Sequence, residues 1–397
     1  MLQTADRSLV ARGAQPQLTA SGSALPESSA DSSAEALPQW SIHVLVPAHD
    51  EEASIGATLA SLRQQTLQPV SITVLADNCS DHTAGAAMIE GAAIYTTVEN
   101  TDHRAGALDQ YLRQNLLSMD PEHFILVLDA DANLDPRFLE TAIRRMSADR
   151  RIGAVGGVFV GNEPRTLLEQ AQANEFVRFA RAVARKEGRV MVLTGRATIY
   201  RVTALLQVAE QRERRLPGRM GDSYDIAALT QDNEITLALT HLGWRIVSPQ
   251  ECTVRTELMP TLGDLHRQRL RWYRGAIENL HTYGWTRVTS RYWVQQVGLL
   301  LCTLGFGLFV AIAAIELSLG QLRWSPLWSA VALLFLVERL VTVWRVGTPR
   351  GRLLALGLVP EIGYDVFLQA TFVRAAFQVV RGVDRSHRPP PARLHRA

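Results

Sequence analysis

Short apolar runs alternate with helix-length segments in the first third of the chain, and three of the runs end in clusters of polar side chains. The runs are Ile42–Val46, Ser71–Ala76 and Phe124–Leu128. Their β-branched and aliphatic residues favour buried strands, and strands that alternate with helices predict a parallel sheet with both faces covered. The polar clusters follow at residues 47–52, 77–81 and 129–131. Because the carboxyl ends of parallel strands meet at one edge of a sheet, we expect these clusters to share one ligand-binding crevice.

The pattern becomes less regular after residue 131 but stays α/β. A Gly-rich strand is expected over Ile152–Val160, a long helix over Arg165–Arg185, and a strand interrupted by a Thr-Gly-Arg sequence over Val190–Tyr200. The Arg-rich segment 211–224 fits an ordinary exposed loop, and a loop that closes over a ligand is the alternative. We predict one α/β domain over residues 39–285, built on a doubly wound, mostly parallel sheet.

Two long apolar segments follow the predicted domain. Val294–Leu319 is long enough to span a bilayer, which takes about 20 residues. Leu327–Trp344 is a second candidate, and its Glu338 and Arg339 are expected to face inward as a pair because charges are costly in lipid. The sequence therefore predicts two transmembrane helices within residues 292–344.

Residues 353–382 form a third apolar stretch with a different pattern. Polar side chains recur every four or five positions, at Glu361, Asp365, Gln369, Arg374 and Gln378. This spacing predicts an amphipathic helix in the membrane interface, with a third span as the alternative. Arginines between the second and third segments and in the basic tail at 383–397 place these parts inside by the positive-inside rule. The expectation is a multi-pass protein of the cell membrane whose α/β domain is cytoplasmic.

Charge and cysteine usage narrow the classes of partner. The formal net charge is +2, so bulk charge indicates no nucleic-acid partner. Cys79, Cys252 and Cys302 are far apart and match neither zinc-site spacing nor a disulfide framework. Residues 1–38 are rich in Ser, Ala, Gln and Pro without hydrophobic periodicity, which is typical of a disordered tail.

Asp129 and Asp131 form a D-x-D sequence directly after an apolar strand. Two carboxylates on alternate residues can reach one divalent cation only where the backbone turns between them, as it does at a strand end. Such a cation can neutralise the diphosphate of a leaving nucleotide. D-x-D alone is weak evidence, because in loops it is often a turn or a helix cap.

Other carboxylates occupy the remaining strand ends. Asp77 could accept the N3–H of a uracil ring, although an Asx-turn or a helix cap explains it equally well. Asp50 and Glu51 carry the same ambiguity. Asp232 lies about 100 residues beyond the D-x-D, where a carboxylate near an acceptor hydroxyl could take its proton. Glu234 is better explained as a charge in the first turn of a helix.

Gln268-Arg269-Leu270-Arg271-Trp272 combines a fork-shaped cation with a large aromatic ring. Arg271 can bind a diphosphate through two nitrogens, and Trp272 can stack on the apolar face of a sugar. An interfacial belt of Arg and Trp before a membrane helix is the alternative.

The ordered set of these motifs resembles family 2 glycosyltransferases, in particular the membrane-anchored branch that contains cellulose, hyaluronan and poly-N-acetylglucosamine synthases. The motifs are Pro47-Ala48-His49-Asp50-Glu51, Ala76 to Asp81, Asp129-Ala130-Asp131, Gln231-Asp232 and Gln268 to Trp272. Arg104 to Leu108 is similar to the Lys-Ala-Gly-Ala-Leu nucleotide contact of the family, with Arg in place of Lys. The resemblance covers roughly residues 40 to 285 and the membrane helices after them.

The resemblance implies a GT-A fold, inverting chemistry, a UDP-sugar donor, and Mg²⁺ or Mn²⁺ as cofactor. It assigns Asp232 as general base, Asp131 and Asp129 to the metal, and Thr194, Gly195 and Trp272 to the acceptor. The residues that it assigns to the donor are Pro47, Ala48, Asp50, Glu51, Asp77, Arg104, Asp129, Gln268 and Arg271. The acceptor, a saccharide or a lipid-linked group, stays open.

Two departures from the family pattern keep alternatives in view. Gln231 replaces the usual Glu before the base, which is the one feature that favours a non-catalytic membrane scaffold. Two spans cannot enclose a channel, so secretion of a long polymer would need a homo-oligomer or a membrane partner. A sugar-nucleotide nucleotidyltransferase shares the expected layout, but it needs a basic Gly-rich loop where this chain has His49 to Glu52.

Overall fold

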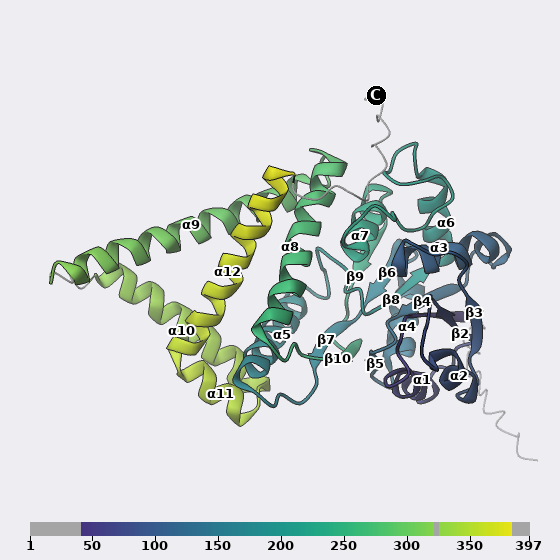
Figure 1. The fold of residues 1–397 in the computed structure, drawn as a ribbon, viewed down its shortest axis with the longest axis horizontal. Coiled ribbons are helices and arrows are strands. Elements are labelled where there is room, and N and C mark those ends of the chain that lie inside the picture. Colours follow the sequence, from purple (N-terminus) through teal and green to yellow (C-terminus); the bar gives the residue numbers. More distant parts are fainter. Residues whose placement is uncertain (1–40, 321–324, 383–397) are drawn as a thin grey trace, which may run out of the picture. The chain divides into compact units, whose positions relative to one another are not determined.

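The computed structural model describes residues 41–320 and 325–382 (Figure 1). The predicted tails at 1–38 and 383–397 lie outside the described residues. Strands and helices alternate through the first part of the described chain, up to Tyr283, and the described residues after it form helices.

The main sheet of the described chain has the strand order β3-β2-β1-β4-β8-β6-β9. Its strands are β1 (Ile42–Ala48), β2 (Ser71–Ala76), β3 (Ala93–Thr96), β4 (Phe124–Leu128), β6 (Ile152–Gly156), β8 (Ala197–Arg201) and β9 (Arg245–Val247). β1 to β4 are parallel, which confirms the layout predicted for the first half of the domain. β8 runs antiparallel to both β4 and β6, so the sheet is mostly but not wholly parallel.

Register aligns the strand ends that carry the polar clusters. Ala48, the last residue of β1, pairs with Ala76, the last residue of β2. Leu128, the last residue of β4, pairs with Ala197 at the start of β8. The residues that follow β4 and those that precede β8 therefore lie side by side.

Helices cover both faces of the main sheet, as Figure 1 shows. One face carries α1 (Ile55–Arg63), α2 (Thr83–Ile89) and α4 (Phe138–Ala148), and the other carries α3 (His103–Asn115), α6 (Val202–Gln211) and α7 (Gln231–His241). Alternate side chains of β1 feed the two cores, with Val44 and Val46 on the first face and Leu45 on the second. This two-sided burial explains why the strands read as continuous apolar runs.

Two predicted strands differ from the structure. Ile152–Val160 divides at Gly157 into β6 and β7 (Val158–Gly161), and β7 belongs to a three-stranded sheet with β5 (Asn133–Leu134) and β10 (Thr253–Thr256). A side chain at Gly157 would come within 2.8 Å of Val254, so the glycine permits this close approach. In Val190–Tyr200 only residues 197–201 form a strand, because residues before Ala197 turn away to meet the end of β4.

The prediction that 211–224 is an ordinary exposed loop is wrong for its last three residues. Asp222, Ser223 and Tyr224 are buried, and the backbone N–H groups of Ser223 and Tyr224 donate to Oδ1 of Asp109 on α3. Arg212 is buried as well, and its guanidinium donates to both carboxylate oxygens of Glu234 on α7. These contacts fix the loop beside the start of α7, which also makes Glu234 a buried ion-pair partner.

α5 (Leu167–Arg185) and α8 (Leu262–Tyr283) connect the sheet domain to the C-terminal helices. α5 begins with a capping box between Thr166 and Glu169, as the sequence favours. α8 crosses the start of α7 closely, since a side chain at Gly275 would come within 2.4 Å of Oγ1 of Thr230.

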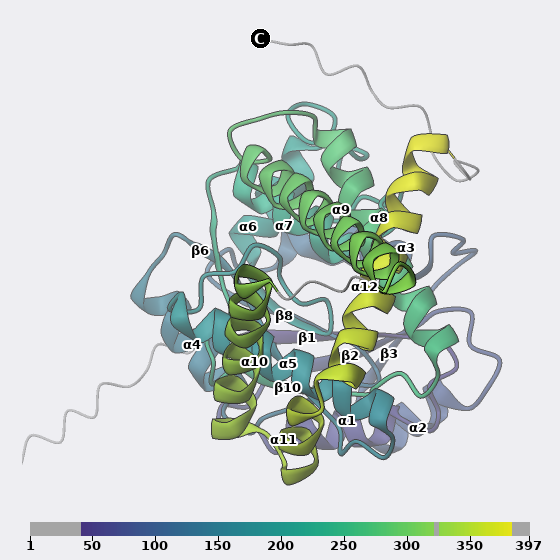
Figure 2. The ribbon, with the colours of Figure 1, turned by 90° about the vertical axis from the view of Figure 1, so that its left-hand side faces the viewer.

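The C-terminal helices are α9 (Ser290–Ser318), α10 (Pro326–Val346), α11 (Pro349–Leu356) and α12 (Leu358–Arg381). Among the described residues α9 is long and apolar enough to cross a membrane, which agrees with the first predicted span; α10 does not meet the same criteria. Residues 353–382 form two helices instead of one, as Figure 2 shows. They are bent by 81°, and only when counted together do they make a second candidate span. The structure therefore offers one helix that could span a membrane by its length and composition, and it does not support the predicted multi-pass topology.

Ion pairs correct the predicted orientation of α10 and α12. Arg339 pairs with Glu361 and Asp365 of α12, and not with its neighbour Glu338. Glu361 also accepts hydrogen bonds from Asn174, at 3.0 Å, and Arg178, at 3.1 Å, both on α5. The first residues of the polar face of α12 therefore contact α5 and α10, whereas the sequence predicts contact with lipid headgroups and water.

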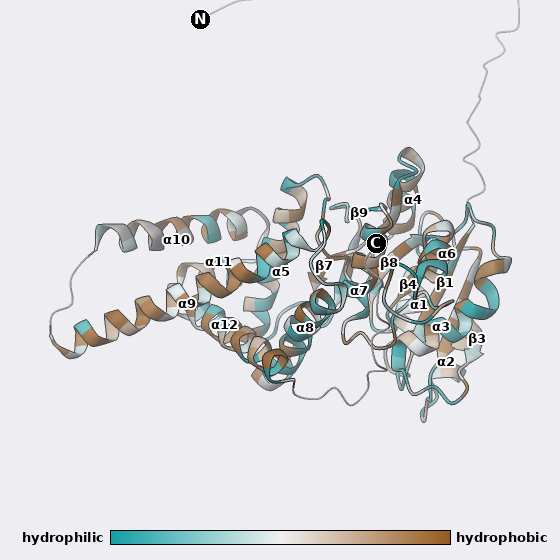
Figure 3. Ribbon diagram, turned by 90° about the horizontal axis from the view of Figure 1, so that it is seen from above, coloured by the Kyte–Doolittle hydropathy of each residue, from teal (hydrophilic) through white to brown (hydrophobic). Residues whose placement is uncertain are grey.

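The opposite face of α12 exposes large apolar side chains. These are Ile362, Val366, Val373, Phe377 and Val380. α9 exposes a longer series of leucine, isoleucine and valine side chains, and Figure 3 shows the hydrophobic colouring along both helices. Exposed apolar surface on this scale marks a surface that another apolar phase or molecule covers.

Candidate active site

Asp129 and Asp131 lie where β4 ends and the backbone turns. The N–H of Asp129 donates to the carbonyl of Arg196, at 2.8 Å, and the N–H of Ala132 donates back to the carbonyl of Asp129. Ala130 between them is buried, and its carbonyl accepts the hydroxyl of Thr58. Both aspartate side chains keep 25% of their surface exposed, so they are open to a ligand on one side.

Two arginines and a third carboxylate complete the group. Nε of Arg104 lies 3.0 Å from Asp129, and another of its nitrogens, Nη1, lies 3.7 Å from Oδ1 of Asp232. Arg196 pairs through Nη1 with Asp131 and reaches Asp129 at 3.8 Å. We call these five residues the site cluster. Its three carboxylates and two guanidiniums leave one negative charge in excess when all are ionised.

Asp232 reaches the site cluster because its neighbour Gly195 has no side chain to block it. It lies in the first turn of α7, and a Cβ atom built on Gly195 would fall 2.2 Å from its carboxylate. Nη2 of Arg104 donates to the carbonyl of Gly195, at 2.8 Å, which holds this backbone in place. Any side chain at position 195 would therefore push Asp232 away from the other carboxylates.

Burial and ion pairing shift the pKa values of these side chains in opposite directions. Burial raises the pKa of Asp129, although Arg104 and Arg196 oppose the shift. Burial alone would lower the pKa of Arg104, but Asp129 and Asp232 outweigh it, so the net shift is upward. The same balance, with Asp129 and Asp131 as partners, raises the pKa of Arg196. Both guanidiniums therefore stay charged at any physiological pH.

Asp77 is held at the end of β2 by the loop after β3. Its Oδ1 accepts hydrogen bonds from Nδ2 of Asn100, at 2.7 Å, and from Oγ1 of Thr97, at 2.8 Å. Asp81 instead accepts the N–H of Thr83 at the start of α2, whose N-cap residue, His82, makes no side-chain cap hydrogen bond. Asp77 is thus a buried carboxylate oriented by two side chains that the sequence did not single out.

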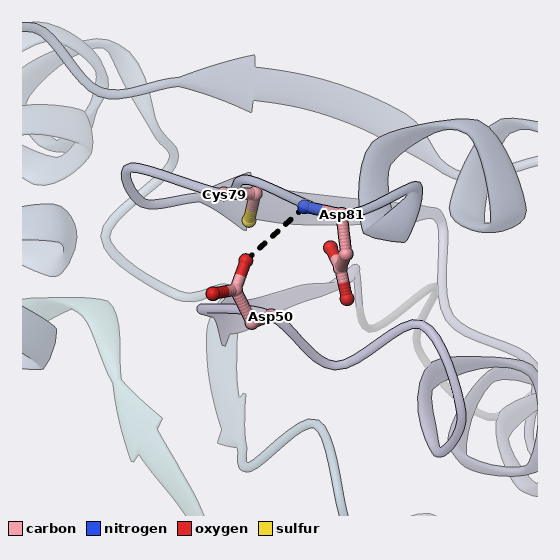
Figure 4. Close-up of side chains that lie close together, drawn as sticks. All are labelled: Asp50, Cys79 and Asp81. Carbon is pink, nitrogen blue, oxygen red and sulfur yellow. Dashed lines mark hydrogen bonds between the residues drawn. The ribbon is translucent and has the colours of Figure 1, made fainter.

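Asp50, Cys79 and Asp81 also bring possible ligand atoms within 4.8 Å of one another, as Figure 4 shows. Hydrogen bonds account for this arrangement. Asp50 accepts the N–H groups of Ser80, at 2.7 Å, and Asp81, at 3.3 Å, and the bonds from Ser80 lower the pKa of Asp50. Asp81 in turn accepts the N–H of Glu52. These carboxylates join the loop after β1 to the loop after β2.

The other predicted donor residues near the end of β1 are Pro47, Ala48 and Glu51. Pro47 and Ala48 are buried in β1, and the N–H of Glu51 donates to the hydroxyl of Thr83, at 2.7 Å. His49 contributes as well, since its Nδ1 lies 2.6 Å from the carbonyl of Asp77. The predicted donor residues of β1 and β2 therefore form one connected edge of the sheet.

Gln268, Arg271 and Trp272 lie on α8. Arg271 is exposed, whereas Gln268 and Trp272 are half-buried. Arg269 covers one face of the Trp272 ring, with its Cζ 4.4 Å from the ring centroid, and its Nη2 donates to Glu175 of α5, at 2.9 Å. One ring face of Trp272 is thus already occupied.

The resemblance places Thr194-Gly195-Arg196 on the acceptor side and assigns Arg196 no role of its own. Thr194 is buried and its hydroxyl donates to the carbonyl of Gly157, at 2.6 Å, so it supports the turn before β8. Arg196 instead carries a charge into the site cluster. The available signal was the Thr-Gly-Arg sequence that interrupts an otherwise apolar strand pattern.

Comparison with known proteins decides the family. Residues 38–275, more than half of the chain, match the family described as "Glycosyltransferase like family 2". The chain belongs to this family. This glycosyltransferase domain is 25% identical over 252 residues to poly-beta-1,6-N-acetyl-D-glucosamine synthase of Staphylococcus aureus, covering 60% of this chain and 55% of that protein. The Staphylococcus epidermidis protein of the same name is 21% identical over 263 residues, with 63% and 58% covered. The chain thus spans little more than half the length of these relatives.

A solved structure agrees with the fold. The mannosyltransferase PcManGT from Pyrobaculum calidifontis, in complex with GDP-Man and Mn²⁺, superimposes with a TM-score of 0.52 at 18% identity, covering 87% of this chain and 89% of that one. The likeness shows a GT-A-like α/β fold for the family 2 domain.

Proposed function

We propose that this glycosyltransferase moves a sugar from a UDP-sugar to a saccharide or lipid-linked acceptor at the cytoplasmic face of the cell membrane, with inversion at the sugar C1. The observation that carries the proposal is the site cluster. Asp129, Asp131 and Asp232 come from one strand end and one helix start, and the fold leaves them partly open at the edge where α/β proteins bind ligands.

Asp129 and Asp131 fit a divalent cation. Both are partly exposed carboxylates on either side of a backbone turn, and oxygen ligands of this kind suit Mg²⁺ and Mn²⁺. PcManGT, which shares the fold, is bound to Mn²⁺. When bound, the cation would supply positive charge to the diphosphate that leaves with the nucleotide.

Asp232 is proposed as the general base. It takes the proton of the acceptor hydroxyl while that oxygen forms a bond to the sugar C1 and the bond from C1 to the diphosphate oxygen breaks. The electron pair leaves with the nucleoside diphosphate, and attack from the face opposite the leaving group inverts C1. Arg104 contacts both Asp129 and Asp232, so it fixes the distance between the donor side and the base.

The remaining predicted residues divide between donor and acceptor. Asp77, oriented by Thr97 and Asn100, is proposed to hold the base of the nucleotide. Arg271 and Gln268 on α8 are proposed for the diphosphate. Trp272 presents its second ring face to a sugar, because Arg269 covers the first. The staphylococcal relatives named as polysaccharide synthases support a saccharide acceptor.

Membrane attachment is proposed on α9 and on the outward face of α12. α9 meets the length and apolarity of a span, and the exposed apolar side chains of α12 would contact lipid while its polar side stays on protein. The arginines after the apolar segments favour the cytoplasmic side for the sheet domain.

A donor scan tests the proposal. The full chain, purified in detergent, is incubated with Mn²⁺, candidate acceptors and a series of UDP-sugars, with GDP-mannose as the alternative nucleotide. One preferred donor and a β-linked product by NMR would support an inverting transferase. Retention of configuration at C1 would contradict the base assignment. Nucleotide binding without any transfer would favour the scaffold alternative.

A further inference from the structure

Arg196 forms an ion pair with Asp131, one of the two aspartates proposed to bind the metal. It lies just before β8, and its own carbonyl accepts the N–H of Asp129, so its backbone is tied to the end of β4. From this position Nη1 bonds directly to Oδ2 of Asp131. The antiparallel pairing of β4 with β8 therefore places the backbone of Arg196 so that its guanidinium can reach Asp131.

A guanidinium and a divalent cation compete for the same oxygen. Mg²⁺ takes carboxylate oxygens at about 2.1 Å, so a cation on Oδ2 of Asp131 would lie next to the guanidinium that bonds to the same oxygen. Like charges at such a distance repel. Binding of the cation to Oδ2 of Asp131 therefore favours movement of Arg196 away from that oxygen.

The pair between Arg196 and Asp131 is weak enough to open. Both side chains keep more than a fifth of their surface exposed, so solvent partly screens the pair. Arg104 is more firmly held, because it bonds to Asp129, to the carbonyl of Gly195 and lies near Asp232. Of the two arginines, Arg196 is the one that a ligand displaces more easily.

We propose that Arg196 is a built-in counter-ion for Asp131 that a divalent cation and the donor's diphosphate displace together. This inference rests on the proposed metal site. The released guanidinium can bind the diphosphate, because its planar fork can donate to two phosphate oxygens at once. Metal and nucleotide then favour each other's binding, and thermodynamic linkage makes the effect the same in both directions.

Mn²⁺ binding to the full chain, followed by electron paramagnetic resonance with and without UDP, tests the inference without any need for turnover. For Arg196→Gln we expect about fivefold tighter Mn²⁺ binding in the absence of UDP, which corresponds to loss of a competing ion pair of about 1 kcal/mol. With UDP present we expect little or no gain, so the factor by which UDP tightens Mn²⁺ binding shrinks.

The matched control is Arg151→Gln, which removes an arginine from an exposed pair with Asp149 and is expected to change neither value. If loss of the arginine acted only by lowering the positive electrostatic potential at the site, Mn²⁺ binding would tighten equally with and without UDP. That result, or unchanged Mn²⁺ affinity in Arg196→Gln, would overturn the inference. If no form of the protein binds Mn²⁺, the inference and the metal assignment both fall. If Mn²⁺ binds as expected but no donor is used, only the proposed activity falls.

Discussion

Two groups of charges in this protein look alike in composition but differ in balance and access. The site cluster has three carboxylates for two guanidiniums, and its members are all partly exposed. The second group, which we call the helix junction, consists of Arg178, Arg339, Glu361 and Asp365.

The helix junction has as many cations as anions, and Glu361 at its centre is fully buried and accepts hydrogen bonds from α5 and α10. A charge-balanced group whose central carboxylate is fully buried and paired holds helices together. A group with an excess of negative charge and open oxygens can exchange a protein cation for a ligand. The same residue types therefore serve structure in one place and are proposed to serve chemistry in the other.

The largest expected effect comes from the site cluster. Asp232→Asn keeps the size of the side chain but removes the proton acceptor, so we expect transfer to fall by about 10²- to 10⁴-fold. UDP binding, measured by calorimetry, should be nearly unchanged because the donor residues are intact. Transfer at the wild-type rate would show that the excess charge of the cluster has no catalytic meaning.

Removal of the central carboxylate of the helix junction is expected to act on stability instead. Glu361→Ala leaves Arg339 and Arg178 without their buried partner, and such a loss costs about 3–5 kcal/mol. Thermal unfolding in detergent measures the change. Glu338→Ala, an exposed glutamate on α10, is the matched control and should alter the melting temperature little. Equal melting temperatures of the two variants would show that the helix junction contributes no more to stability than an exposed surface charge does.

Gly195→Ala tests the open space in front of Asp232. Its new methyl group would fall within 2.2 Å of the carboxylate, so Asp232 must move away from Arg104. We expect transfer to drop by about tenfold or more, since small displacements of catalytic groups cost rate heavily. The control is Gly56→Ala, where a Cβ meets nothing within 4 Å. Loss of folding in Gly195→Ala, seen as a lower melting temperature, would instead make the glycine structural.

Asp109 is a single buried carboxylate that belongs to neither group, and no described cation contacts it directly. Its Oδ2 has no hydrogen-bond partner among the described residues, and burial, reinforced by Asp222, raises its pKa to about 8. Because this lies above the ordinary value of 3.8, the folded state holds a proton that the unfolded chain releases. The free energy of unfolding therefore falls as pH rises from about 4 to 8.

Asp109→Asn keeps the acceptor for the N–H groups of Ser223 and Tyr224 and cannot ionise. We expect its melting temperature to match the wild type near pH 4–5 and to exceed it at pH 8, with a difference that grows as pH rises. Parallel melting curves at both pH values would mean that Asp109 does not titrate in this range.

The sequence predicts well those features that depend on neighbours along the chain. Continuous apolar runs such as Phe124–Leu128 indicate strands buried on both faces, and the polar residues after them mark the sheet edge. D-x-D at Asp129 and Asp131 was found in this way. The helical spacing of Glu361 and Asp365 likewise predicted a polar face on one helix.

What these residues contact depends on distant parts of the chain. Arg196 meets Asp131 only because β8 turns out antiparallel to β4, which no local pattern encodes. Periodicity shows that α12 has a polar face but cannot show that α5 and α10 supply its partners. Arg339 was therefore assigned to Glu338, its nearest acid in sequence, when its partners lie on the next long helix.

The most direct test of the proposed activity is metal-dependent release of UDP by the full chain, compared between the wild type and Asp131→Ala. If the site cluster is an active site that binds a divalent cation, the wild type releases UDP from one preferred donor, and both EDTA and the substitution abolish that release. Release that persists unchanged in Asp131→Ala, or in EDTA, would contradict the assignment of the site cluster as a metal-dependent transferase site.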